Sequence, residues 1–363
     1  MQKLFLLAGL FLSIAWLGAT ERLVCLYNSI SDQRRGIGHF EIGDIKPFLC
    51  THIIYSFVGI DSKWGISVGS SDKIKFPLFK DLKKRDPAMK TLLEVNLISS
   101  PFVQEMLSMQ GNRRVFINSA LSLLRNPDYT FDGINLLWLE SRQRGDKKLF
   151  TNLIQEFRRA INLEAAKRGY EKLLLTASVS AQPLVISRSY EVKLIAEHID
   201  FFNVMTSDVE IPFVKGKPSF YTTGDSFSKA ASAVNFWNKQ GVPTQKINMG
   251  IGVFGEAFTI NSLGIVNPAG GNVPDIPEGF LARYEVCSFL QGLLMAASDK
   301  QVVFDDIASI DAKASYIKQH KYGGAFVMSL DLDDFNQQCC SHPSKYPVIQ
   351  HLHDELVLKF VIG

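Results

Sequence analysis

The sequence predicts an α/β protein: a closed (β/α)8 TIM barrel with a small, shortened α+β insertion after the seventh strand. Short apolar runs rich in β-branched residues recur along the 363 residues, and amphipathic helical patterns lie between most of them. Nearly continuous apolar strands separated by helices are typical of a parallel sheet that is covered on both faces. Because there are eight such runs, we expect the sheet to close into a barrel.

The predicted elements alternate in chain order. The strands are expected at Leu23–Tyr27, His52–Gly59, Thr91–Leu97, Gly133–Leu139, Lys172–Ser180, Phe201–Thr206, Ile247–Phe254 and Gly324–Leu330. The helices are expected at Arg113–Leu124, Lys148–Arg168, Ser189–His198, Ser226–Gln240 and Ile310–His320. No Gly-x-Gly-x-x-Gly joins a predicted strand to a predicted helix, so a dinucleotide-binding open sheet is disfavoured.

One interval interrupts this alternation. A Gly/Pro-rich stretch, Asn261–Pro277, is followed by an apolar helix-like run, Phe280–Ala297. We therefore expect an insertion subdomain at 258–304 within a single barrel domain that spans 21–363.

The first twenty residues have the pattern of a secretory signal. Lys3 precedes the apolar run Leu4–Leu17, and the small residues Gly18, Ala19 and Thr20 follow. The run is short for the ~30 Å hydrocarbon core of a membrane. The sequence thus predicts cleavage near Thr20 and a secreted, extracellular protein without a membrane span.

Composition and charge exclude several classes of protein. An apolar content of 46% is too high for a disordered chain. The 39 Lys and Arg residues nearly balance 36 Asp and Glu, so no nucleic-acid partner is predicted, and the basic run Lys80–Arg85 is expected to be a solvated helix face. His351 and His353 are two residues apart, which is wrong for ligands on one helix face, and we predict no metal site and no cofactor.

The fourth strand carries the residues that suggest a family. It reads Phe131-Asp132-Gly133-Ile134-Asn135-Leu136-Leu137-Trp138-Leu139-Glu140. Here the chain resembles glycoside hydrolase family 18, specifically the secreted animal chitinases and chitinase-like lectins. The resemblance covers essentially the whole chain after the signal, and further matching stretches are Leu23–Cys25, Thr51–Phe57, Leu173–Ala177, Ala282–Cys287, Gly323–Ala325 and Asp331–Phe335.

The resemblance implies where catalysis would occur. Members that cut chitin carry Asp-x-x-Asp-x-Asp-x-Glu on this strand, and the glutamate protonates the glycosidic oxygen while an aspartate orients the substrate's N-acetyl group. The matching positions here are Asp132, Asn135, Leu137 and Leu139. Leu139 has no proton to donate, so the chain is predicted not to be an enzyme, and Asp132 is expected to be a structural hydrogen-bond acceptor.

Glu140 is the one carboxylate near the end of this strand. Successive strand side chains point to opposite faces, so Glu140 is expected to aim away from the face shared by Asn135, Leu137 and Leu139. A catalytic Glu140 is therefore the least favoured hypothesis.

The resemblance also implies a weakened sugar-binding wall. Tryptophans on which relatives stack sugars fall at Ile30, Ile98 and Met328, and two tyrosine hydroxyls are missing at Ser207 and Phe254. The carbohydrate-binding candidates that remain are Phe57, Trp64, Met205, Asp208, Phe254 and Met328. For Phe57 and Met205, core packing is an equally good interpretation. Trp64 either reaches the cleft or covers a loop, whereas Trp138 and Trp237 are expected to pack among the helices.

The five cysteines are an odd set, so at least one thiol is left over. The resemblance implies the disulfides Cys25–Cys50 and Cys287–Cys340, which leave Cys339 unpaired.

Together these features predict a catalytically inactive, secreted chitinase-like protein with at most weak binding of chitooligosaccharides or other glycans. The alternative is an extracellular interaction or signalling protein that binds a protein partner and uses the barrel only as a scaffold. An active chitinase is the least favoured of the three.

Overall fold

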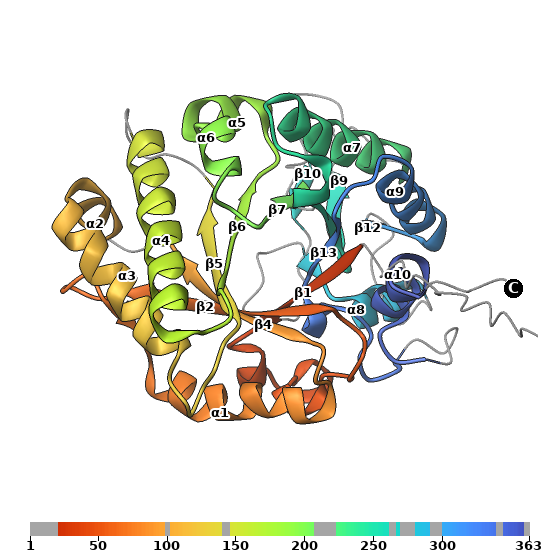
Figure 1. The fold of residues 1–363 in the computed structure, drawn as a ribbon. Helices are drawn as coiled ribbons and strands as arrows, with labels where there is room; N and C mark the ends of the chain where they lie inside the picture. The colour runs from red at the N-terminus through yellow and green to blue at the C-terminus, as the bar shows by residue number, and fades with distance from the viewer. Residues whose placement is uncertain are drawn as a thin grey trace, which may run out of the picture.

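The computed structural model describes residues 21–98, 102–139, 146–206, 223–260, 266–268, 280–290, 300–338 and 344–358. Eight parallel strands form a closed barrel, because the first strand pairs with both the second and the last (Figure 1). The strands are β1 (Arg22–Asn28), β2 (His52–Ile60), β4 (Lys90–Asn96), β5 (Gly133–Trp138), β6 (Leu174–Ser180), β7 (Phe201–Met205), β8 (Ile247–Gly252) and β13 (Gly324–Met328). All eight predicted strands are confirmed, with their ends shifted by a few residues.

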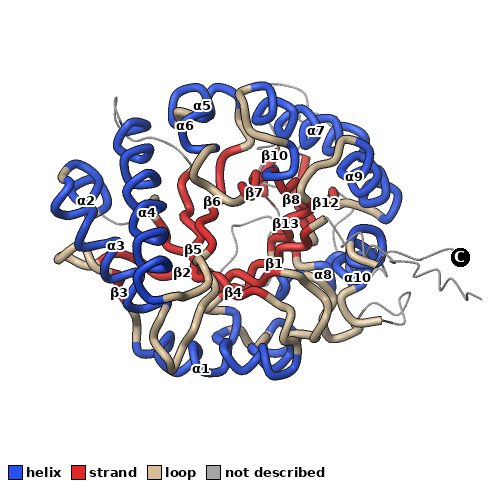
Figure 2. The backbone as a smooth tube through the Cα atoms, viewed as in Figure 1, coloured by secondary structure: helices blue, strands red, loops and turns tan. Residues whose placement is uncertain are grey.

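Helices surround this barrel (Figure 2). They are α1 (Ser70–Arg85), α2 (Val103–Ser108), α3 (Gln110–Leu124), α4 (Asp146–Arg168), α5 (Pro183–Ser189), α6 (Val192–Ala196), α7 (Thr223–Lys239), α9 (Ile307–Gln319) and α10 (Pro347–Leu356). Of the helix predicted over Ser189–His198, only α6 forms, because Ser189 ends α5 and the chain breaks between the two helices. Tyr190, at the break, donates its hydroxyl to the Trp138 carbonyl and accepts the Ser180 N–H.

The basic run Lys80–Arg85 ends α1, and it is only partly a solvated face. Lys84 is exposed and pairs with Asp81. Lys80 and Arg85, in contrast, donate to loop carbonyls, and Lys83 pairs with Asp132 at the start of β5. The run therefore holds loops at the amino-terminal end of the barrel.

The insertion lies between β8 and α9. Its centre is β9 (Gly255–Ile260), which pairs antiparallel with β10 (Val266–Pro268), β11 (Phe280–Leu281) and β12 (Lys300–Phe304). The apolar run Phe280–Ala297 contains β11 and α8 (Arg283–Leu290), and its residues 291–297 lie outside the described part of the chain. The sheet begins at Gly255, three residues before the predicted boundary of the subdomain.

The barrel separates two apolar layers. Trp138 points outward and stacks on Phe150 of α4, with ring centroids 5.0 Å apart, and Trp237 of α7 is fully buried. Both tryptophans therefore pack among the helices, as predicted. The opposite faces of the strands fill the barrel with a smaller cluster that includes Val24, Ile54 and Phe326.

A disulfide joins Cys25 on β1 to Cys50 just before β2, with Cα atoms 6.1 Å apart, as the resemblance implied. Cys287 is also disulfide-bonded. Both candidate partners, Cys339 and Cys340, lie outside the described residues, so the second pairing stays a prediction. So does the signal segment 1–20, for the same reason.

Within the described residues, no helix combines the length and apolar character needed to cross a membrane.

Candidate functional site

Chemistry in a (β/α)8 barrel collects at the carboxyl ends of the strands, and Asp132 is at the other end. It precedes β5, and its Oδ2 accepts the Thr91 N–H at 2.7 Å and the Thr91 hydroxyl at 3.2 Å. Lys83 pairs with the same carboxylate. Asp132 is thus the structural acceptor that the sequence predicted.

Asn135 points into the barrel and is fully buried. Its Nδ2 donates to Glu94 Oε2 at 2.6 Å and to Ser178 Oγ at 2.8 Å. Its Oδ1 accepts the Thr176 hydroxyl at 2.7 Å. Every polar atom of this amide is engaged with the protein, so the side chain is a structural link between β4, β5 and β6.

Glu94, on β4, is the functional candidate that the sequence reasoning missed. Besides Asn135 and Ser178, its carboxyl accepts the Ser56 hydroxyl of β2 at 2.8 Å. Burial raises the pKa of Glu94 to about 7, and the hydrogen bonds from Ser56, Asn135 and Ser178 oppose this rise. The sequence carried a signal for Glu94, because a charged residue in an otherwise nearly continuous apolar strand needs a polar partner.

The polar contacts continue across the barrel toward β1. Asn203 on β7 donates to Asn135 Oδ1 at 3.3 Å, and Asn248 on β8 donates to Asn203 Oδ1 at 2.9 Å. Arg22 Nε then donates to Asn248 Oδ1 at 3.2 Å. Side chains from β1, β2, β4, β5, β6, β7 and β8 therefore form one connected network, called here the barrel network.

The residues at the expected proton-transfer positions are apolar. Leu137 and Leu139 are half-buried beyond the barrel network, toward the carboxyl end of β5. Leu139 packs in the interior cluster that also contains Met205 and Met328. Glu140 and Asp208 lie outside the described residues, so the structure says nothing of either carboxylate.

The remaining sugar-contact candidates differ in accessibility. Phe57 is 49% exposed, and Ile30, which stands at one of the lost tryptophan positions, is 44% exposed, so both are accessible to a ligand. Phe254 is only 7% exposed and lies against Phe280, with ring centroids 4.9 Å apart, which makes it a packing residue.

Trp64 follows β2 and is packed against the main hydrophobic core. The neighbouring Ile66 N–H donates to Ser119 of α3. The structure thus favours the loop-covering interpretation of Trp64 over a place in the cleft.

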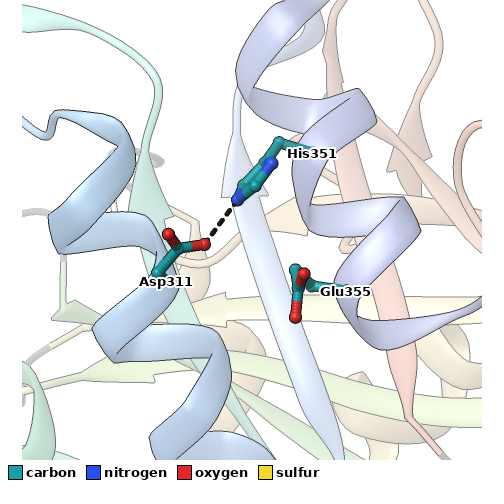
Figure 3. Close-up of side chains that lie close together, drawn as sticks. All are labelled: Asp311, His351 and Glu355. Carbon is teal, nitrogen blue, oxygen red and sulfur yellow. Dashed lines mark hydrogen bonds and ion pairs between the residues drawn. The ribbon is translucent and has the colours of Figure 1, made fainter.

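A cluster of potential metal ligands lies between α9 and α10 (Figure 3). Asp311 Oδ1 is 2.6 Å from His351 Nε2, and one carboxylate oxygen of Glu355 lies within 4.8 Å of both ligand atoms. His351 was weighed above with His353, but in the structure it contacts Asp311 and lies near Glu355. Lys318 pairs with Glu355 at 2.6 Å, so the polar contacts of Asp311, His351 and Glu355 link the two helices.

An open groove with a volume of 530 Å³ lies on the helix layer, away from the barrel interior. Two arginines give it a basic character, but Arg158 is paired with Asp200 at 2.6 Å. Its lining is Gln155, Arg158, Arg159, Asn162, Leu163 and His198.

Comparison with known proteins identifies the family. Residues 22–333 match the model of glycosyl hydrolases family 18. Chitotriosidase-1 of Mus musculus is 36% identical, with 96% of this chain and 80% of that protein covered. Chitinase-3-like protein 2 of Homo sapiens is 33% identical, with 92% of each covered.

A solved structure agrees with this assignment. Human YKL-39, described as a pseudo-chitinase with retained chitooligosaccharide binding properties, superposes with a TM-score of 0.81 at 30% identity. The superposition covers 93% of this chain and 99% of that one. The protein belongs to glycosyl hydrolase family 18.

Proposed function

We propose that this protein is a catalytically silent, secreted chitinase-like protein whose cleft binds chitooligosaccharides or other glycans weakly. The observation that carries the proposal is Leu139, which stands at the family's proton-donor position and packs with Met205 and Met328. A leucine cannot protonate a leaving oxygen, and general acid catalysis typically contributes 10²–10⁴-fold to the rate.

The substrate-assisted part of the reaction also lacks its groups. Members that cut chitin place aspartates at the positions of Asn135 and Leu137. Here the Asn135 amide is committed to Glu94, Ser178 and Thr176. Neither side chain carries a charge to orient an N-acetyl group or to stabilise the developing positive charge.

Weak sugar binding is supported by what the cleft still exposes. Phe57 offers an aromatic face, and Ile30 offers an aliphatic one. A relative described as a pseudo-chitinase with retained chitooligosaccharide binding shares the fold. Binding without turnover is thus compatible with this architecture.

The expected affinity is low. A sugar covers part of one aromatic face, so each lost ring platform is expected to cost about 1–2 kcal/mol of binding free energy. Replacement at Ile30, Ile98 and Met328 would then remove about 3–6 kcal/mol, or roughly two to four decades of affinity. Isoleucine and methionine recover part of the contact, which favours the lower end of this range.

Two measurements on the purified secreted protein test the proposal. Calorimetry with a chitin hexamer should give a dissociation constant well above the micromolar range, and incubation with chitin or chitooligosaccharides should release no product above a blank. Turnover that is abolished by Glu140→Gln would contradict the silent site. A glycan array without any binder would instead favour the scaffold hypothesis, in which the cleft recognises a protein.

A further inference from the structure

The Glu94 carboxyl is buried at the centre of the barrel, and the proposed function does not use it. The residue is 1% exposed, and its oxygens accept hydrogen bonds from three neighbouring side chains. Ser56 Oγ lies 2.8 Å from Oε1, while Asn135 Nδ2 and Ser178 Oγ lie 2.6 Å and 3.3 Å from Oε2. All three donors are neutral groups on other strands.

The strands around Glu94 bring no cation to it. Strands β5, β6, β7, β8 and β13 contain no titratable residue at all. Arg22, His52 and Lys90 each stand at the first residue of their strand, at the amino-terminal end of the barrel. Burial and the nearby Arg22 lower the pKa of His52 to about 3, so this histidine is neutral.

The remaining titratable residues of the barrel strands face outward. Tyr55 donates its hydroxyl to Asp72 of α1, and Tyr27 packs against Phe40 and Phe79. Cys25 is held in its disulfide. Burial is the main cause that raises the pKa of Glu94 to about 7, and no charge from a described residue contributes to the shift.

We propose that Glu94 is a proton-binding positioning residue: the chain folds with this carboxyl protonated, and loss of the proton loosens the strands beneath the cleft. The geometry supports the protonated form, because the Ser56 and Ser178 hydroxyls can each accept a hydrogen bond as well as donate one. After ionisation, a negative charge stands in the barrel interior without a counter-ion among the described residues, which is costly in a low-dielectric interior.

The direction of the pH effect follows from linkage. The unfolded chain loses this proton near pH 4.3, whereas the folded chain keeps it until about pH 7. Between these values the folded state binds more protons, so the free energy of unfolding falls as the pH rises. Protonated Glu94 contributes its full stabilisation to the folded state below about pH 4. This stabilisation decreases as the pH rises to about 7, and above that pH the titration of Glu94 no longer changes the free energy of unfolding.

Phe57, a proposed sugar contact, lies on one of the strands that Glu94 connects. Ser56 precedes the exposed Phe57 on β2, and Asn135 alternates with Leu137 on β5, which Leu139 directly follows. Ionisation of Glu94 is therefore expected to disturb the sugar-contact residues. This last step rests on the proposed function, whereas the stability effect does not.

The test is chemical denaturation of the full secreted chain between pH 4.5 and 8.5, for the wild type and Glu94→Gln. Glutamine has the shape of glutamate and can hydrogen-bond to the same three side chains, but it has no titrating proton. Relative to Glu94→Gln, the wild-type folding equilibrium constant should fall by on the order of a hundredfold between pH 4.5 and pH 8. Asp128→Asn, which removes one charge at an exposed position, should follow the wild type.

Burial also raises the pKa of Asp333, to about 6, so part of the wild-type slope has another origin. Asp333 is present in both proteins, and only the difference between their curves is assigned to Glu94. Parallel curves for the two proteins would overturn the proposal.

Ser56→Ala keeps the proposal testable if Glu94→Gln does not fold. Removing this donor should destabilise the protein more at pH 8 than at pH 5, because the donor matters most to the ionised carboxyl. An equal loss at both pH values would show that Glu94 does not change its charge in this range, and would overturn the proposal.

Calorimetry with a chitin hexamer at pH 5.5 and pH 8 separates the two proposals. Wild-type affinity should decrease at pH 8, and the affinity of Glu94→Gln should not. If neither protein binds the sugar at either pH, the proposed function fails, and the stability difference alone decides the role of Glu94.

Discussion

Carboxylates at the two ends of the barrel have different surroundings. At the amino-terminal end, Asp132 and Asp200 each precede a strand and accept the N–H of the neighbouring strand, from Thr91 at 2.7 Å and Leu175 at 2.8 Å. A helix supplies the counter-ion in both cases, Lys83 for Asp132 and Arg158 for Asp200. The same arrangement thus appears twice.

At the carboxyl-terminal end, we propose that the carboxylates needed for catalysis are replaced, while other carboxylates remain. The resemblance matches the family's acids to Asn135, Leu137 and Leu139. Asp331, after β13, is fully buried and pairs with Arg34 at 2.5 Å. The described carboxylates that persist here have structural partners.

The comparison teaches that fold and chemistry depend on separate residues in this barrel. The partnered acids link strands and helices of the barrel, while the positions that we propose for the lost chemistry are separate from them. Four substitutions test this distinction between residues for the fold and residues for chemistry.

Arg34→Met should cause the largest loss. It leaves the buried Asp331 carboxylate without its counter-ion, which is expected to cost about 3–5 kcal/mol of unfolding free energy. Burial raises the pKa of Asp331 and Arg34 opposes this, so the loss should grow as the pH rises and the carboxyl ionises. Denaturant unfolding at pH 5 and pH 8 measures it, with the exposed Arg35→Met as the control. Equal stability of the two variants would show that the pair is not structural.

Asp132→Ala comes next, at the amino-terminal end. The Thr91 N–H and Lys83 would lose their acceptor, and charge-assisted hydrogen bonds of this kind are worth about 1.5–3 kcal/mol. Thermal unfolding should show a lower midpoint, while Asp128→Ala should leave it nearly unchanged. If Asp132→Ala changed sugar binding but not stability, the division between the two ends would be wrong.

Leu139→Glu should not create a chitinase. The new carboxyl would enter the cluster around Met205 and Met328, at a cost of about 1–2 kcal/mol, and the inner aspartates would still be absent. Product release from chitooligosaccharides should stay at the level of the blank. Turnover in this single variant would mean that the carboxyl-terminal end has kept more of its chemistry than we propose.

Phe57→Ala should have the smallest effect, and on binding alone. Loss of part of one aromatic contact is expected to cost about 1 kcal/mol, or roughly a fivefold rise in the dissociation constant for a chitin hexamer. Phe48→Ala removes an even more exposed ring, 65% accessible, just before β2 and is the matched control. Identical affinities for the two variants would remove Phe57 from the proposed contact surface.

The spacing of apolar residues along the chain and the amino-acid composition determined the parts of the molecule that depend on local sequence. The apolar runs predicted all eight strands, because burial on both faces requires continuous apolar residues. Alternation along β5 predicted that Trp138 faces the helices, where it stacks on Phe150. The absence of a proton donor at position 139 also follows from the sequence, because leucine has no acidic proton in any surroundings.

Only the tertiary structure decided which distant side chains meet. The partners of Glu94 come from β2, β5 and β6, and the Asp311 partner of His351 comes from another helix, so no short sequence spacing marks either contact. The break at Tyr190 also depends on carbonyl and N–H groups of β5 and β6. Such contacts exist only after the barrel has closed, because closure brings together strands that are tens of residues apart and sets the burial that shifts a carboxyl's pKa.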